Sequence, residues 1–142
     1  MQDSKINNSY EPLYDDQKNI RIVQEAMFSS TNEIMGTSYK SRIDDPKYQF
    51  AGKTGTAQVK RISKRERELD LETFQIPYEE RDHALYVAYG PYSNPRYAVS
   101  IIVEHGGSGS SAAAPMATQL FKLIIDRHQY RKKMPDYKEF SI

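Results

Sequence analysis

One stretch organises the rest of the chain: Phe50-Ala51-Gly52-Lys53-Thr54-Gly55-Thr56-Ala57-Gln58-Val59. It predicts a strand, although two glycines lie inside it. Glycine within a strand costs stability and often marks the close approach of a ligand or of another backbone. The glycines flank a lysine and two threonines, so the stretch places one cation, two hydroxyl groups and an unshielded backbone on a short rigid element. Such a set of groups suits an anionic substrate.

A phosphate-binding P-loop is one alternative for this stretch. Gly52-Lys53-Thr54 matches the end of the pattern G-x-x-x-x-G-K-[ST], but the position that needs the first glycine holds Lys47. A helix should also follow Thr54, and Gly55 with Thr56 argues against a helix. The other structural alternative is an edge strand whose lysine and threonines merely face solvent.

Composition limits the classes of function. The chain has 142 residues, enough for one domain with a core, and its net charge of +1 gives no support for nucleic-acid binding. Cysteine is absent, which excludes disulfides and a thiol nucleophile. His83, His105 and His128 are scattered singly, so we expect no metal site, and no motif indicates a cofactor. No stretch approaches the ~20 apolar residues of a membrane span, and the N-terminus lacks the apolar segment of a signal peptide.

Periodicity predicts a helix before this strand and a hairpin and a helix after it. The first helix runs from Asp15 or Asp16 to about Ser29. Its apolar residues share one face that we expect to pack in the core: Ile20, Val23 and Met27, with Ile22 and Ala26 beside them. The last helix runs from Ala112 to about His128. Its expected buried stripe consists of Met116, Leu120, Phe121, Leu123 and Ile124.

A β-hairpin is predicted over residues 83–104, with a turn at residues 91–95. Residues 96–104 form the clearest strand and are apolar on both faces, so we expect this strand to be central in the sheet with helices on both sides. The glycine-rich residues 106–111 predict a hinge or connector rather than a phosphate cradle.

The ends of the chain and one insertion are polar. Residues 1–14 predict a flexible lead-in, residues 15–130 a folded region and residues 131–142 a charged tail. Charges of both signs are dense over residues 60–82, which predicts a solvated loop or a short helix.

Lys53-Thr54-Gly55 also matches the Lys-Thr-Gly box of penicillin-binding proteins and serine β-lactamases. Its context strengthens this match: Thr56-Ala57-Gln58 follows the box, Val103-Glu104-His105-Gly106-Gly107 ends the hairpin, and Ala113-Ala114-Pro115 opens the last helix. Over residues 16–128 the chain closely resembles the C-terminal part of the transpeptidase domain of class B penicillin-binding proteins. Within that family, the elongation transpeptidases of the penicillin-binding protein 2 type are nearest.

The resemblance implies an α+β fold: a three-stranded antiparallel meander flanked by N- and C-terminal helices, as part of a β-lactamase/transpeptidase-like fold. It also implies acyl transfer that cross-links peptidoglycan stem peptides on the periplasmic side of the bacterial inner membrane. The implied partners are the stem peptide, β-lactams and the N-terminal part of the transpeptidase domain. The alternative, from another class of function, is a non-catalytic interaction module that retains the sheet.

The resemblance assigns the site residues as well. Lys53 would be the catalytic cation and would bind the substrate's carboxylate together with Thr54, Gly55 and Thr56, and the backbone N–H of Thr56 would be one oxyanion donor. Strict alternation along a strand places Thr54 and Thr56 on one face and Lys53 on the other.

Two further motifs of the family have no match where the family places them. No serine is followed by lysine three places later, and Thr37-Ser38-Tyr39-Lys40 gives only T-x-x-K. Ser30-Thr31-Asn32 matches the S-x-N motif, but it lies so near Lys53 that we expect a chance match. Gly36-Thr37 is similar to a Gly-Thr segment that lies under the active site in class B relatives. We therefore expect a fragment, or a truncated or split gene product, that is inactive alone.

The first prediction concerns the nucleophile. The chain alone should form no covalent adduct with penicillin, because the S-x-x-K serine is absent from its sequence. Mass spectrometry after incubation should show no added mass. A stoichiometric adduct on Ser30 or on any other serine would contradict this expectation.

Overall fold

The computed structural model describes residues 16–60 and 71–133 of the chain. The predicted lead-in over residues 1–14, most of the predicted tail and residues 61–70 of the charged insertion lie outside this part. Within it, no helix is long and apolar enough to cross a membrane.

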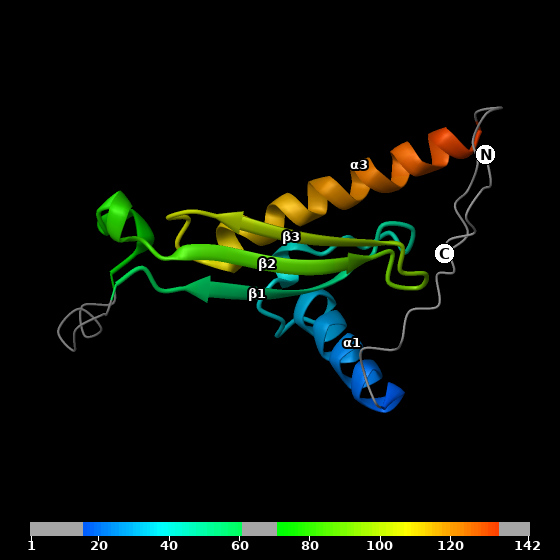
Figure 1. The fold of residues 1–142 in the computed structure, drawn as a ribbon, viewed down its shortest axis with the longest axis horizontal. Coiled ribbons are helices and arrows are strands. Elements are labelled where there is room, and N and C mark those ends of the chain that lie inside the picture. Colours follow the sequence, from blue (N-terminus) through cyan, green and yellow to red (C-terminus); the bar gives the residue numbers. More distant parts are fainter. Residues whose placement is uncertain (1–15, 61–70, 134–142) are drawn as a thin grey trace, which may run out of the picture.

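A three-stranded antiparallel sheet lies at the centre of the structure, as Figure 1 shows. The strands are β1 (Ala51–Ala57), β2 (His83–Gly90) and β3 (Tyr97–Val103), in that spatial order. Helix α1 (Gln17–Asn32) precedes the sheet, and helix α3 (Ala114–Lys132) follows it. The predicted α+β meander flanked by N- and C-terminal helices is confirmed.

Helix α1 begins as predicted but packs differently. The Asp16 carboxylate accepts a hydrogen bond from the backbone N–H of Lys18 at 2.8 Å, which caps the first turn. The predicted buried stripe is wrong for Val23, which is 55% exposed, and Ile22 beside it is also exposed. The reason is that only the C-terminal end of α1 meets β1, while the N-terminal end of the helix points away from the sheet (Figure 1). Thr31 is therefore the one fully buried residue of α1.

The prediction that residues 96–104 form the central strand is wrong. Among residues 16–60 and 71–133, strand β2 is central and pairs with both neighbours, whereas β3 lies at an edge of the sheet. Apolar residues on both faces suggested double burial, but Ile102 is 63% exposed. Within the described residues, no helix covers the face of β3 at Ile102.

Helix α3 lies across the other face of the sheet. Its buried residues are Ala114, Ala117, Phe121 and Ile125. The predicted stripe was therefore right for Phe121 and wrong for Met116, Leu120 and Leu123, which are exposed. Small alanines allow the helix axis to approach the strands closely, and this contact decides the orientation of the helix. Pro115 lies in the first turn of α3, a position where proline is common.

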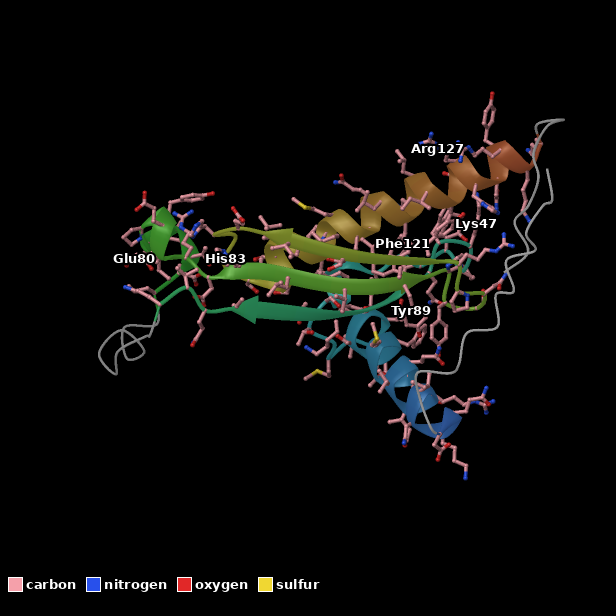
Figure 2. All side chains as sticks on the ribbon, in the orientation of Figure 1. Lys47, Glu80, His83, Tyr89, Phe121 and Arg127 are labelled. Carbon is pink, nitrogen blue, oxygen red and sulfur yellow. The ribbon has the colours of Figure 1, made fainter. Side chains whose placement is uncertain are left out.

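Aromatic rings fill the space between α3 and the sheet. Phe50 stacks on Phe121 with ring centroids 4.8 Å apart and meets Tyr86 edge-on at 6.5 Å. At the surface, Asp126 of α3 accepts hydrogen bonds from Lys47 at 2.8 Å and from the Tyr48 hydroxyl at 2.6 Å. Hydrogen bonds with Asp126 and then Tyr48 raise the pKa of Lys47 to about 12. Figure 2 shows Lys47 and Phe121 near the same helix, where they tie α3 to the segment that leads into β1.

The Tyr86 side chain connects the central strand to β1 and α1. It is 1% exposed, and its ring lies against the backbone of Gly52. The Tyr86 hydroxyl lies 2.9 Å from Thr31 Oγ1 and 3.1 Å from Ser38 Oγ. Burial raises the pKa of the Tyr86 phenol, while the hydrogen bonds to Ser38 and Thr31 act in the opposite direction. Gly52 therefore leaves the space that this ring occupies.

The second prediction tests this contact. A Cβ at Gly52 would overlap the hydroxyl and ring of Tyr86, which is buried and cannot move aside. We expect Gly52→Ala to lower the free energy of unfolding by about 1–3 kcal/mol, the usual cost of overpacking. Denaturant titration followed by circular dichroism measures this change.

The matched control is Gly55→Ala in the same strand. A Cβ there would lie 3.3 Å from Leu85 Cβ and farther from every other non-neighbouring atom, so a shift of a few tenths of an ångström relieves the contact. We expect its free energy of unfolding to change by less than about 1 kcal/mol. Equal stabilities of the two variants would contradict the role of Tyr86.

Candidate active site

Strand β1 is an edge strand, with β2 on one side and a second edge free of any strand in the described part of the chain. The N–H of Gly52 donates to Thr31 Oγ1 at 3.0 Å, and the Gly52 carbonyl oxygen lies 3.3 Å from the same hydroxyl. Both backbone groups of Gly52 therefore point to this second edge. Because alternate residues of an antiparallel strand point their backbone groups the same way, Thr54 and Thr56 also present their N–H and C=O groups there.

The C-terminal end of α1 closes the first half of this edge. Thr31 bonds the backbone of Gly52, and Asn32 Nδ2 donates to the Phe50 carbonyl at 2.9 Å. The backbone groups of Thr54 and Thr56 lie beyond these contacts. The edge of β1 is thus divided into a half that α1 occupies and a half that carries Thr54 and Thr56.

Lys53 lies as the alternation predicts. It pairs with Val87 across the sheet and is exposed, whereas Thr54 pairs with the buried Tyr86. Its side chain then bends back toward its own strand, and Lys53 Nζ donates to the Thr54 carbonyl oxygen at 2.8 Å. Since that carbonyl points to the second edge, the ammonium group lies at the edge beside Thr54.

Three hydroxyl groups line up at the same place. Thr54 Oγ1 lies 3.1 Å from Thr37 Oγ1, which lies 3.2 Å from Ser30 Oγ. Lys40, the lysine of the T-x-x-K match, is exposed in the short 3-10 turn Tyr39–Ser41. The row of hydroxyls therefore comes from α1, from the segment after it and from β1.

The glycine-rich segment packs against the sheet. Residues Gly109–Ala113 form a π-helical turn that leads directly into α3, and Gly109 is buried. A Cβ at Gly109 would overlap the backbone carbonyl oxygens of Leu85 and Gly55. Of the predicted hinge or connector, the connector is confirmed, since the segment joins β3 to α3. At Gly109 backbone packs on backbone, which requires glycine.

The histidines near this end of the sheet bind each other. The backbone N–H of His105 donates to His83 Nδ1 at 2.9 Å, and the centroids of the two rings are 4.8 Å apart. His105 Nδ1 lies 3.1 Å from the Arg81 carbonyl. Within residues 16–60 and 71–133, no group of three His, Cys, Asp or Glu side chains is placed to hold a metal ion.

The four residues singled out in the sequence, Lys53 to Thr56, follow one another in β1. The structure brings the Lys53 ammonium and the backbone groups of Thr54 and Thr56 to the free edge of this strand. It also brings Thr37 there, as the Gly36-Thr37 match predicted, together with two residues that the sequence did not assign to this site, Ser30 and Thr31. Ser30-Thr31-Asn32 lies along β1, although its match to S-x-N suggested only chance. The sequence did carry a signal for these residues, because the polar run Ser29-Ser30-Thr31-Asn32 ends a helix whose earlier residues follow an apolar pattern.

Known proteins match this chain over most of its length. A family model described as the penicillin binding protein transpeptidase domain matches residues 14–122. The peptidoglycan D,D-transpeptidase MrdA of Haemophilus influenzae is 33% identical over 119 residues. MrdA of Acinetobacter baumannii is 44% identical over 116 residues.

The coverage of these relatives is unequal. The matches take in 84% and 80% of this chain, but only 17% of the Haemophilus protein and 15% of the Acinetobacter protein. The crystal structure of Pseudomonas aeruginosa PBP2 in complex with WCK 5153 superposes with a TM-score of 0.61 at 32% identity, covering 81% of this chain and 21% of that chain. Its relatives are thus of the penicillin-binding protein 2 type, and the chain belongs to the penicillin-binding protein transpeptidase domain family.

Proposed function

We propose that this chain is the part of a peptidoglycan D,D-transpeptidase that carries the Lys-Thr-Gly substrate-binding strand but not the nucleophilic serine. The observation that carries this proposal is the divided edge of β1. Thr31 and Asn32 close one half of the edge. On the other half, the ammonium of Lys53 lies beside Thr54.

This edge suits a peptide that ends in a carboxylate. An extended peptide can add to a free strand edge through main-chain hydrogen bonds. Its carboxylate would then lie near the Lys53 ammonium and the Thr54 and Thr56 hydroxyls. The N–H of Thr56 points to the same edge and would donate to the oxyanion that develops on the reacting carbonyl.

The bond changes involve a serine outside this chain. In the proposed reaction, the serine oxygen bonds to the carbonyl carbon of the donor stem peptide, the peptide C–N bond breaks, and the serine proton ends on the leaving amine. The nitrogen of an amine on a second stem peptide then bonds to the acyl carbon, the ester C–O bond breaks, and a proton of the amine returns to the serine oxygen. In a β-lactam the broken C–N bond lies in the ring, so the leaving nitrogen stays attached to the acyl-enzyme. This chain contributes binding and charge stabilisation to these steps.

The remaining part of such a domain is the proposed partner. Within the described residues the outer edge of β3 has no strand beside it, and Val87 and Ile102 expose apolar surface. An N-terminal part of the domain would cover this surface and supply the other two motifs. We place the complete protein on the periplasmic side of the inner membrane, because peptidoglycan is there.

The alternative is a non-catalytic module that binds a partner through the open face of the sheet. A groove of about 400 Å³ on that face favours it. Its lining residues come from α1, β2 and β3: Met27, Val87, Ala88, Tyr89, Ala98, Val99 and Ser100. In that case, changes at Lys53 would leave partner binding intact.

The third prediction separates these functions. A complete domain can be built from the Acinetobacter relative by replacing its matching segment with this chain. In that domain, Lys53→Ala should slow acylation by fluorescent penicillin ~10²–10³-fold. Lys53 is exposed, so the free energy of unfolding should change by less than about 1 kcal/mol. Gel-based labelling over time measures the rate.

Lys40→Ala is the matched control, because Lys40 is an exposed lysine in the turn Tyr39–Ser41. It should leave the acylation rate unchanged. If Lys53→Ala labelled as fast as the unsubstituted domain, the edge of β1 would not be the substrate-binding wall, and the interaction module would be favoured.

A further inference from the structure

Four side chains with hydroxyl groups at the end of α1 and in the segment after it form two rows with different roles. Thr31 and Ser38 are buried and lie within hydrogen-bond distance of the Tyr86 hydroxyl. Ser30 and Thr37 form the other row, which ends at Thr54 Oγ1 on the open half of the edge. Thr31 and Ser38 thus belong to the buried row, whereas their neighbours in sequence, Ser30 and Thr37, belong to the exposed row.

The backbone around Thr37 is held independently of its side chain. The N–H of Ser38 donates to the Ser30 carbonyl at 3.0 Å, and Ser38 Oγ donates to the same oxygen at 3.0 Å. The N–H of Gly36 donates to the Glu33 carbonyl at 2.8 Å, and a Cβ at Gly36 would overlap the carbonyls of Ser29 and Ser30. Thr37 itself is exposed. Its hydroxyl is therefore not needed to hold this segment on α1.

An anionic ligand determines the direction of the exposed row. A hydroxyl has one proton to donate and two lone pairs, whereas a carboxylate only accepts. If Thr54 donates to a carboxylate, its contact with Thr37 requires Thr37 to donate to Thr54. Thr37 must then accept from Ser30. Hydrogen bonds that run in one direction polarise one another, which strengthens the last donor in the chain.

We propose that Thr37, supported by Ser30, is a positioning residue that holds the Thr54 hydroxyl as a hydrogen-bond donor to the substrate's carboxylate. This inference rests on the proposed function of β1. It assigns a role to the segment between α1 and β1, whose side chains do not themselves need to touch the substrate.

The fourth prediction is tested first by NMR on this chain alone. Three-bond couplings from Thr54 Cγ2 to the backbone nitrogen and carbonyl carbon, measured by NMR, report the side-chain rotamer. They should show one rotamer in the unsubstituted chain and in Thr37→Ser, which keeps the hydroxyl, but averaging in Thr37→Val. Ser93→Ala, at an exposed serine in the turn before β3, is the control and should change nothing. A single, unchanged Thr54 rotamer in Thr37→Val would overturn the proposal.

The second arm measures acylation in the complete domain described above. Thr37→Val should slow acylation by a carboxylate-bearing penicillin roughly five- to tenfold, the effect of one neutral hydrogen bond, and Thr37→Ser should restore the rate. In a Thr54→Val background, Thr37→Val should have no further effect, because Thr37 acts only through Thr54. Additive effects would overturn the inference. Ser30→Ala provides a second variant, with a smaller expected loss, if Thr37→Val does not fold.

The two levels of the proposal fail differently. If Thr54→Val acylates at the unsubstituted rate, the proposed function of β1 fails and the positioning role fails with it. If Thr54→Val is slow while Thr37→Val is not, only the positioning role is wrong.

Discussion

The buried hydroxyl of Tyr86 is the contact on which the arrangement of β1, β2 and α1 depends. A phenol taken out of water without hydrogen-bond partners costs free energy, so its burial requires Thr31 and Ser38 to be near it. The ring reaches those partners by passing against Gly52, where a side chain would block it. One interaction therefore joins the central strand, the edge strand and the end of α1.

The same contact shapes the candidate active site. Because Tyr86 holds Thr31 at the edge of β1, Thr31 also satisfies the backbone of Gly52. The end of α1 thus closes half of the edge, and Lys53 and Thr54 lie on the other half beside a rigid support. Donors held in place before a substrate binds stabilise developing charge without reorganisation. The packing that stabilises this fold therefore also fixes the strand edge that we propose binds the substrate.

Large apolar residues were poor guides to the core of this chain. In α3 the residues that touch the sheet are two small alanines with Phe121 and Ile125, while Leu123 is 64% exposed. In β3, Ile102 lies on a face that no described helix covers at that end. Periodicity located both α-helices and the strands of the hairpin, because it depends on local geometry. It could not identify the buried face, because burial depends on which surfaces other elements reach.

The sequence by itself determined what depends on neighbouring residues. These features are the strands and their alternation, a helix cap at Asp15 or Asp16, the proline in the first turn of α3, and the Lys-Thr-Gly box with Lys53 and Thr54 on different faces of its strand. Only the tertiary structure decided that the hydroxyls of Thr31 and Thr37 contact β1 and that Ser30 contacts Thr37. The hydroxyls of Thr31 and Tyr86 lie 55 positions apart in sequence, and those of Thr37 and Thr54 lie 17 apart. No local pattern encodes such pairs, because they form only when a helix end, a turn and a strand edge pack together.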